Sequence, residues 1–141
     1  MEKRYEILPH TADSKFRAFG LTLEEAYGNA AVALASLMWD WAKIPSRKTI
    51  ELQVRARDRE QLLVKFLNEI IFLADTRGFL LGSVEELLID ETDTGLALKA
   101  RLRGDDRSGG YELSGEVKAA TYNEIYIKED GGFKVEAVVD S

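Results

Sequence analysis

The sequence predicts an α+β fold in which two amphipathic helices pack on a largely antiparallel β-sheet. Two segments carry apolar side chains three and four residues apart, which is the period of a helix with one buried face. Other segments alternate apolar and polar residues, which is the period of a half-buried strand. Turn sequences such as Asp130-Gly131-Gly132 join successive strands and favour hairpins, so we expect antiparallel pairing.

The composition describes one soluble globular domain covering residues 1–141. The 45% apolar content is ordinary, and the sequence shows no repeat and no linker. Cysteine is absent, which excludes disulfides and thiolate chemistry and suits a cytoplasmic location. We expect no signal peptide and no membrane span, because no apolar run approaches ~20 residues. The net charge of −6 disfavours strong direct binding of nucleic acid, which depends on Lys and Arg.

The first half of the chain predicts two short strands, residues 4–8 and 14–20, followed by a helix. Thr22 and Glu25 have the spacing of a capping box, which places the start of the helix there. The helix should run to about Trp39. Its apolar face consists of Leu23, Ala26, Tyr27, Ala30, Leu34, Leu37 and Met38.

A strong strand at residues 49–57 leads into the second helix. Asp58 and Gln61 cap its start, and Gly78 is the expected end. Its wide apolar face indicates the most buried helix, with Leu62, Leu63, Phe66, Leu67, Ile70, Ile71 and Ala74.

The second half predicts antiparallel strands at residues 79–89 and 95–103. Residues 104–110 carry no apolar side chain and should form a mobile loop. A long strand is expected at 117–128, and the last strand at 133–139.

Three carboxylates form the candidate functional site. Asp13 follows the first predicted strand, Asp140 ends the last one, and Ser141 offers its α-carboxylate. If the first and last strands pair, these groups converge. Three negative charges at such short range repel one another unless a hard cation or protons lie between them. The alternative is a solvated loop aspartate and a frayed terminus. Against fraying, the alternation of the last strand continues to Val139.

His10 is the only histidine, and it could be a ligand, a proton shuttle or a structural residue that orients the Asp13 loop. Residues 118–123 mix Lys118, Thr121 and Tyr122 with alanines, so a partner surface or a phosphate could approach closely; the alternative is an ordinary strand with a solvated lysine. The spacing gives no Ser-His-acid triad, no acid/base carboxylate pair and no phosphate-binding loop. An enzyme is therefore not favoured.

Four motifs in order carry a family resemblance. They are the His10–Asp13 tetrapeptide, the helical stretch 67–71, the segment 117–122 and the terminal segment 138–141. Together they resemble the archease family over nearly the whole chain.

The resemblance implies a protein cofactor and not an enzyme. Archeases activate the GTP-dependent RNA ligase that joins tRNA halves in tRNA splicing. They promote guanylylation of the ligase histidine, multiple turnover and wider nucleotide use. Carried over to this sequence, the metal site falls on Asp13, Asp140 and Ser141, with Ca²⁺ expected in a crystal and Mg²⁺ or Mn²⁺ in function. Lys118 matches a family lysine, whereas Asn123 stands where the family commonly has His and cannot titrate.

Two function classes follow. The first is a ligase activator that presents a metal-bearing acidic site, with GTP and tRNA halves reached through the ligase. The second is a metal-dependent hydrolase, or a general chaperone for RNA-modifying enzymes. A hydrolase would turn over a substrate alone, and a chaperone would tolerate loss of Asp13.

Overall fold

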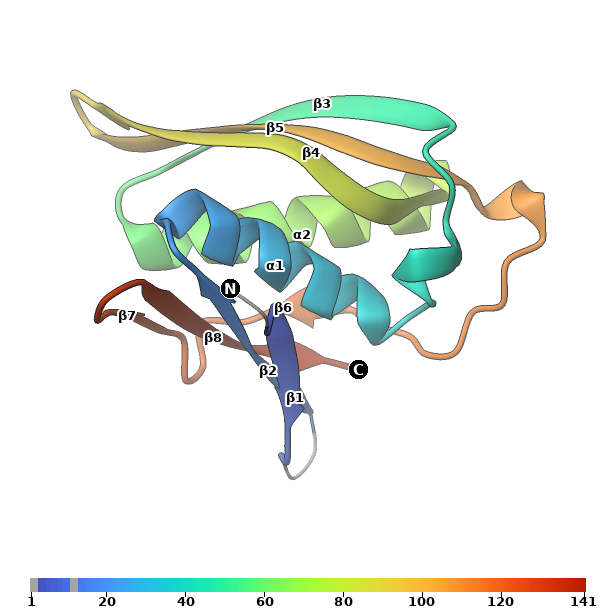
Figure 1. The fold of residues 1–141 in the computed structure, drawn as a ribbon, viewed down its shortest axis with the longest axis horizontal. Helices are drawn as coiled ribbons and strands as arrows, with labels where there is room; N and C mark the ends of the chain where they lie inside the picture. The colour runs from blue at the N-terminus through green and yellow to red at the C-terminus, as the bar shows by residue number, and fades with distance from the viewer. Residues whose placement is uncertain (1–2, 11–12) are drawn as a thin grey trace.

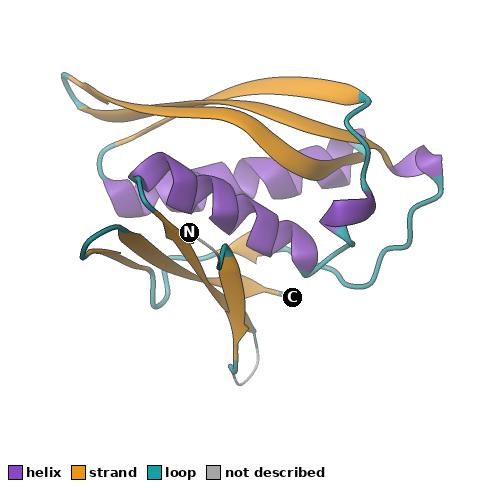
Figure 2. Cartoon of the chain, viewed as in Figure 1, coloured by secondary structure: helices purple, strands orange, loops and turns teal. Residues whose placement is uncertain are grey.

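Two helices lie between two antiparallel β-sheets in the computed structural model, which describes residues 3–10 and 13–141 (Figures 1 and 2). The helices are α1, Leu23–Ser36, and α2, Arg59–Arg77. The strands are β1 (Tyr5–Leu8), β2 (Ser14–Gly20), β3 (Lys48–Ala56), β4 (Phe79–Thr92), β5 (Gly95–Asp106), β6 (Ala119–Ala120), β7 (Tyr126–Glu129) and β8 (Phe133–Asp140). Two short 3-10 helices are η1 (Trp41–Lys43) and η2 (Arg107–Gly109). The predicted α+β class is confirmed, with the strands divided between two sheets.

The larger sheet joins the beginning and the end of the chain. Its strand order is β1-β2-β8-β6, and β7 pairs with β8 as well. The smaller sheet has the order β3-β5-β4. Each of these pairings is antiparallel. Helix α1 contacts β2 on one side and β4 on the other, so the helices form the middle of three layers (Figure 1).

Helix α1 begins as the capping box predicts but ends earlier. The Thr22 hydroxyl accepts the N–H of Glu25 at 3.1 Å, and the Glu25 carboxylate accepts the N–H of Leu21 at 2.9 Å. The helix stops at Ser36 and does not reach Trp39. Trp39 is buried, and its indole N–H donates to the carbonyl oxygen of Leu81 in β4 at 2.9 Å. The end of α1 is therefore set by the packing of Trp39 against the smaller sheet.

Both predicted boundaries of α2 are confirmed. Asp58 accepts the N–H of Gln61 at 2.8 Å, and the Gln61 side chain accepts the N–H of Arg57 at 2.9 Å. Gly78 follows the helix with φ of 66°, in the left-handed region that favours glycine. Neither of the helices formed by the described residues is long and apolar enough to cross a membrane.

The mobile loop predicted for residues 104–110 is wrong in its first half. Strand β5 continues to Asp106, and Gly104 and Asp105 are buried. The hydrogen bond from the Tyr111 hydroxyl lowers the pKa of Asp105, which stays charged beside Arg47 at 3.5 Å. Polar contacts order this segment, and an apolar pattern could not reveal them.

Gly104 and Gly28 give a matched pair of substitutions. A Cβ on Gly104 would lie 2.0 Å from the carbonyl oxygen of Leu80, whereas a Cβ on Gly28 would meet only the Val84 side chain at 3.9 Å. We expect Gly104→Ala to destabilise the protein by roughly 1–3 kcal/mol or more through overpacking. Gly28→Ala, inside α1, should stabilise it by about 0.5–1 kcal/mol. Urea unfolding of both variants measures the difference, and equal effects would contradict the packing described for Gly104.

Candidate functional site

The candidate site lies where β2, β8 and β6 meet at one end of the larger sheet. Strand β8 is the common partner: Ser14 of β2 is opposite Val139, and Ala119 of β6 is opposite Asp140. The inward side chains of β8 are buried, which fixes the register, because a slip of one residue would turn them to solvent. The end of β8 is therefore held from both sides.

This register brings two of the three predicted ligands to adjacent strand ends. The last β2–β8 pair is Ser14 opposite Val139. Asp13 immediately precedes Ser14, and Asp140 immediately follows Val139, so the two aspartates come next to this last pair, one on each strand. The expectation that the first strand would pair with the last is wrong, because β2 lies between β1 and β8. Asp13 is still brought next to the end of β8, because β2 begins directly after it and pairs with β8.

The donor types at this edge suit a hard divalent cation. Asp140 and Ser141 are exposed, and Asp13 is half-buried. Carboxylate oxygens are the ligands that Ca²⁺ and Mg²⁺ prefer. Within residues 3–10 and 13–141, no group of three or more His, Cys, Asp or Glu side chains could hold a metal ion. The side chains of Asp13 and Asp140 alone would therefore not complete the ligand set of a metal at this edge.

The long strand predicted for residues 117–128 is wrong. Only Ala119–Ala120 and Tyr126–Glu129 are strands. The side chain of Asn68, from α2, explains the break: its Oδ1 accepts the N–H of Ala120 at 2.7 Å, and its Nδ2 donates to the carbonyl oxygen of Ala120 at 3.3 Å. This amide replaces a neighbouring strand and fixes the segment next to Asp140.

The predicted partner-contact residues lie on that segment. The N–H of Lys118 donates to the carbonyl oxygen of Asp140 at 2.8 Å, so Lys118 is adjacent to the aspartate. Both the N–H and the hydroxyl of Thr121 donate to the carbonyl oxygen of Val138, at 3.1 and 3.2 Å. Tyr122 is 51% exposed. The side chains of Lys118 and Tyr122 are thus available to a partner, whereas Thr121 is structural.

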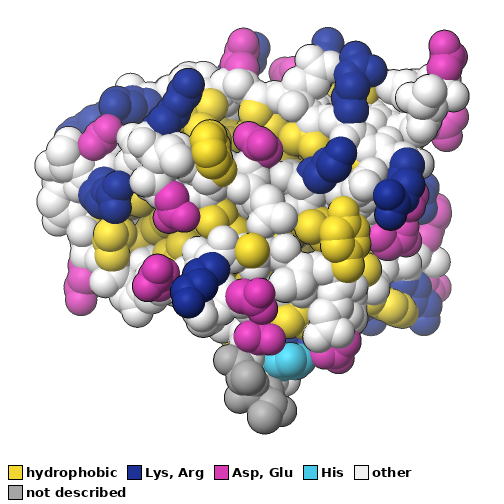
Figure 3. Space-filling view, turned by 180° about the vertical axis from the view of Figure 1, so that it is seen from behind, with side chains coloured by type: hydrophobic (Ala, Val, Ile, Leu, Met, Phe, Trp, Pro, Cys, Tyr) yellow, Lys and Arg dark blue, Asp and Glu magenta, His cyan; other side chains and the backbone are white. Residues whose placement is uncertain are grey.

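His10 contacts the same segment through a residue that the sequence did not single out. Its Nε2 lies 2.8 Å from a carboxylate oxygen of Glu124, whose other oxygen is 3.3 Å from Nζ of Lys15. Its Nδ1 is buried and has no hydrogen-bond partner among the described residues. Figure 3 shows the single histidine (cyan) at the surface with acidic side chains beside it. The contact found for His10 therefore ties residues 10 and 124 together and does not involve Asp13.

Glu124 has a strained backbone, with φ of 54°, the only positive φ of a non-glycine residue in the part of the chain described. Such a conformation costs about 1–2 kcal/mol for a residue with a Cβ. The pKa of Glu124 is lowered, first by the hydrogen bond with His10 and then by the hydrogen bond and positive charge of Lys15. Its carboxylate is therefore held in the charged form. These contacts offset the strain and hold the 121–125 turn against β2.

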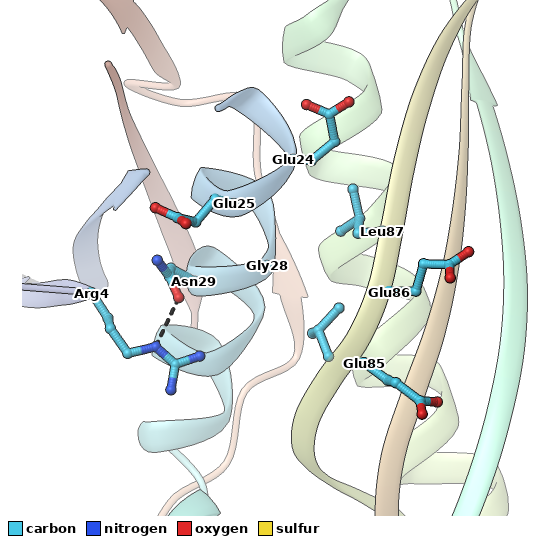
Figure 4. Close-up of a pocket in the computed structure, with 9 residues that line it drawn as sticks. Arg4, Glu24, Glu25, Gly28, Asn29, Glu85, Glu86 and Leu87 are labelled. Carbon is cyan, nitrogen blue, oxygen red and sulfur yellow. Dashed lines mark hydrogen bonds between the residues drawn. The ribbon is translucent and has the colours of Figure 1, made fainter. Parts of the chain in front are cut away.

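A second hollow, of about 420 Å³, lies between α1 and β4 but gathers no comparable chemistry. Arg4 lines it and donates through Nε to the buried Asn29 at 2.8 Å (Figure 4). In Figure 4 the carboxylates of Glu85 and Glu86 point away from α1. Because these acidic groups do not converge on the hollow, the strand end at Asp13 and Asp140 is the better candidate.

Sequence reasoning missed Asn68 and Glu124. Asn68 had a readable signal, because it lies between Val64 and Ile71 on the apolar face of α2, where an amide needs a partner. Glu124 had none, since its contacts with His10 and Lys15 cross more than 100 residues of chain.

We expect Asn68→Ala to destabilise the protein by about 1–3 kcal/mol, because it leaves two backbone groups of the buried Ala120 without partners. Hydrogen exchange of the 118–125 amides should become faster than in the rest of the larger sheet. Asn123→Ala is the control, since Asn123 is exposed and should cause little change. Unchanged exchange in Asn68→Ala would contradict the role given to this amide.

The lowered pKa of Glu124 predicts a pH dependence of stability. A depressed carboxyl pKa stabilises the folded state above the usual glutamate pKa, and this contribution is lost as the pH falls through the folded-state value. The free energy of unfolding should therefore be higher for wild type than for Glu124→Gln at about pH 5.5, and the difference should shrink toward about pH 3. Glu129→Gln, on the exposed edge of β7, should show no such trend. A difference that grows on acidification would refute the assignment.

Comparison with known proteins agrees with the fold and the chain length. The sequence model of the Archease protein family (MTH1598/TM1083) matches residues 5–140. Protein archease of Methanothermobacter thermautotrophicus is 36% identical over 98% of this chain and 99% of its own length. Protein archease of Thermococcus gammatolerans is 37% identical over 98% and 99%.

Solved structures agree as well. The solution structure of Methanobacterium thermoautotrophicum protein 1598 has a TM-score of 0.82 and 33% identity, covering 97% of this chain and 98% of that one. A crystal structure of an archease from Thermotoga maritima, called a possible chaperone, has a TM-score of 0.63 and 22% identity over 100% and 98%, which shows the shared fold. On these grounds the chain belongs to the archease family.

Proposed function

We propose that this protein is a cytoplasmic activator of the GTP-dependent RNA ligase that joins tRNA halves. Its role is to promote guanylylation of the ligase histidine and multiple turnover, and to broaden nucleotide use. One observation carries the proposal: the pairing of β2 with β8 puts Asp13 and Asp140 at adjacent strand ends, directly before Ser141. Carboxylates at one edge of the sheet, with Asp140 exposed and Asp13 half-buried, are suited to presentation to another protein.

Asp13, Asp140 and the α-carboxylate of Ser141 would hold a divalent cation at this edge. When bound, such a cation offsets charge that develops on phosphate oxygens during nucleotidyl transfer. The residues of this chain supply its position. The Lys118 N–H fixes the backbone of Asp140, and the Asn68 amide fixes the segment that carries Lys118.

The exposed residues around the edge would contact the ligase. The side chains of Lys118 and Tyr122 are exposed on the segment that pairs with the end of β8, so they can meet a phosphate or a protein surface. Asn123 cannot exchange protons, so no proton shuttle is assigned to it. GTP and the tRNA halves would be bound by the ligase, consistent with the net charge of −6 of this chain.

The test is guanylylation of the ligase with and without this protein. Asp13→Ala and Asp140→Ala should each lose at least about 10-fold of the stimulation, because loss of even a hydrogen-bonding partner of a metal ligand costs about 10–100-fold. Asp93→Ala is the matched control, because Asp93 lies in the β4–β5 turn of the other sheet and should leave stimulation intact. Unfolding curves should show that both test variants are folded.

A metal titration gives a second readout. Extending the chain beyond Ser141 converts its α-carboxylate to an amide and should weaken binding of Ca²⁺ or Mn²⁺. Full stimulation by both aspartate variants would reject presentation of a metal. Turnover of a substrate without ligase would favour a hydrolase instead. Suppression of the aggregation of unrelated proteins, with Asp13→Ala as active as wild type, would favour a general chaperone.

A further inference from the structure

One edge strand of this protein, β3, is long and regular. Exposed edges normally avoid pairing with other chains by being short, bulged, charged or interrupted by proline. Strands β1 and β7 have four residues each, and β4 has two register shifts. Strand β3 has nine residues paired with β5 without a shift, and it contains no proline. After Lys48, its inward side chains are all apolar: Ile50, Leu52, Val54 and Ala56.

The free hydrogen-bonding groups of β3 can be assigned. Nζ of Lys65, in α2, donates to the carbonyl oxygen of Arg55 at 3.0 Å, so this carbonyl points away from β5. In an antiparallel strand alternate residues direct their N–H and C=O to the same side. Thr49, Glu51 and Gln53 therefore also present their backbone groups at the free edge.

The outer side chains of β3 are complementary to themselves. Glu51 and Arg55 lie two residues on either side of Gln53. Arg101 donates to Oε1 of Glu51 at 3.0 Å. The second carboxylate oxygen, Oε2, is left to pair with another cationic side chain. Among the residues that the structure describes, Arg55 has no ion pair. A copy of the strand turned about Gln53 would place each Glu51 opposite an Arg55.

Helix α2 adds an apolar group next to this edge. It runs back along β3 in the opposite direction (Figure 1), and the Lys65 contact places one of its faces beside the free edge. Phe72 lies on the same face two turns further on and is 56% exposed. A second copy at the edge would cover this ring.

We propose that two copies of this chain form a symmetric dimer by antiparallel pairing of their β3 strands about Gln53. The two smaller sheets become one six-stranded sheet, with Glu51 of each copy opposite Arg55 of the other and the Phe72 faces turned toward each other. Lys65 releases the Arg55 carbonyl, which accepts the N–H of Glu51 from the second copy. A register shifted by two residues would pair Arg55 with Thr49 and lose both charge pairs. The Asp13–Asp140 edge is in the other sheet, so it stays open and the proposal is independent of the proposed function.

A charge exchange tests this dimer. Sedimentation of wild type over a wide range of concentration should show a monomer–dimer equilibrium. Glu51→Arg and Arg55→Glu each set like charges opposite one another, and each should raise the dissociation constant by about 10-fold or more. An equimolar mixture of the two variants should restore association as a heterodimer, because Arg then faces Glu at both positions. Asp90→Arg on β4 is the control and should behave as wild type.

A backbone substitution completes the test. Gln53→Pro removes an N–H that faces the free edge, and it should abolish the dimer and leave the chain folded. Wild type that is monomeric at every concentration would overturn the proposal. So would a dimer that both charge variants leave unchanged, or variants whose mixture does not associate. Binding of a strand from an unrelated protein at β3, without self-association, would also overturn it.

Discussion

The pairing of β8 with three other strands is the interaction on which the larger sheet depends. Val135, Ala137 and Val139 of β8 are fully buried against the helices. Because β2, β6 and β7 are all hydrogen-bonded to β8, its register determines where each of them lies. The candidate site is one result of this register, since β8 brings the start of β2, next to Asp13, and the segment after Lys118 to the same end of the sheet.

Two kinds of force act at the two faces of that strand. On the inner face, burial of small apolar side chains selects the register. On the outer face, Glu136 pairs with Arg17 at 2.7 Å and with Lys15 at 3.6 Å, and Lys15 continues to Glu124. Ion pairs near the surface contribute little stability singly. The Glu136 pairs join β2 to β8, and the Lys15–Glu124 pair fixes the 121–125 turn relative to β2.

Local signals predicted the elements well. Thr22 and Asp58 were identified as helix caps, and the Gly78 stop and the Asp130–Gly132 hairpin turn were also correct, because each depends on neighbouring residues. The division into two sheets was missed. The sequence signal for it is the uninterrupted apolar run from Ala30 to Ala35 in α1, because a helix that is apolar on every side is covered on every side. In the structure all six of these residues are fully buried.

Contacts across long stretches of sequence could not be predicted. The strand expected at 117–128 failed because Asn68, about 50 residues earlier, replaces a strand neighbour. The alternation of the last strand did predict an ordered Asp140, and so half of the candidate site. The neighbours of Asp13 needed the fold, because nothing in the spacing of residues 13 and 140 shows that β2 and β8 are paired.

The position of β8 in the chain has a consequence for the order of assembly. Residues 48–106 contain the whole smaller sheet and α2, so this part can form from near neighbours in the sequence. The β2–β8 pairs instead close loops of more than 100 residues, which is slow in folding. During synthesis β8 leaves the ribosome after all of its partner strands. Until then the β1–β2 hairpin lacks the strand that joins it to the rest of the larger sheet. The Asp13–Asp140 edge is therefore assembled last, and a nascent chain that already contains both helices and the smaller sheet still lacks it.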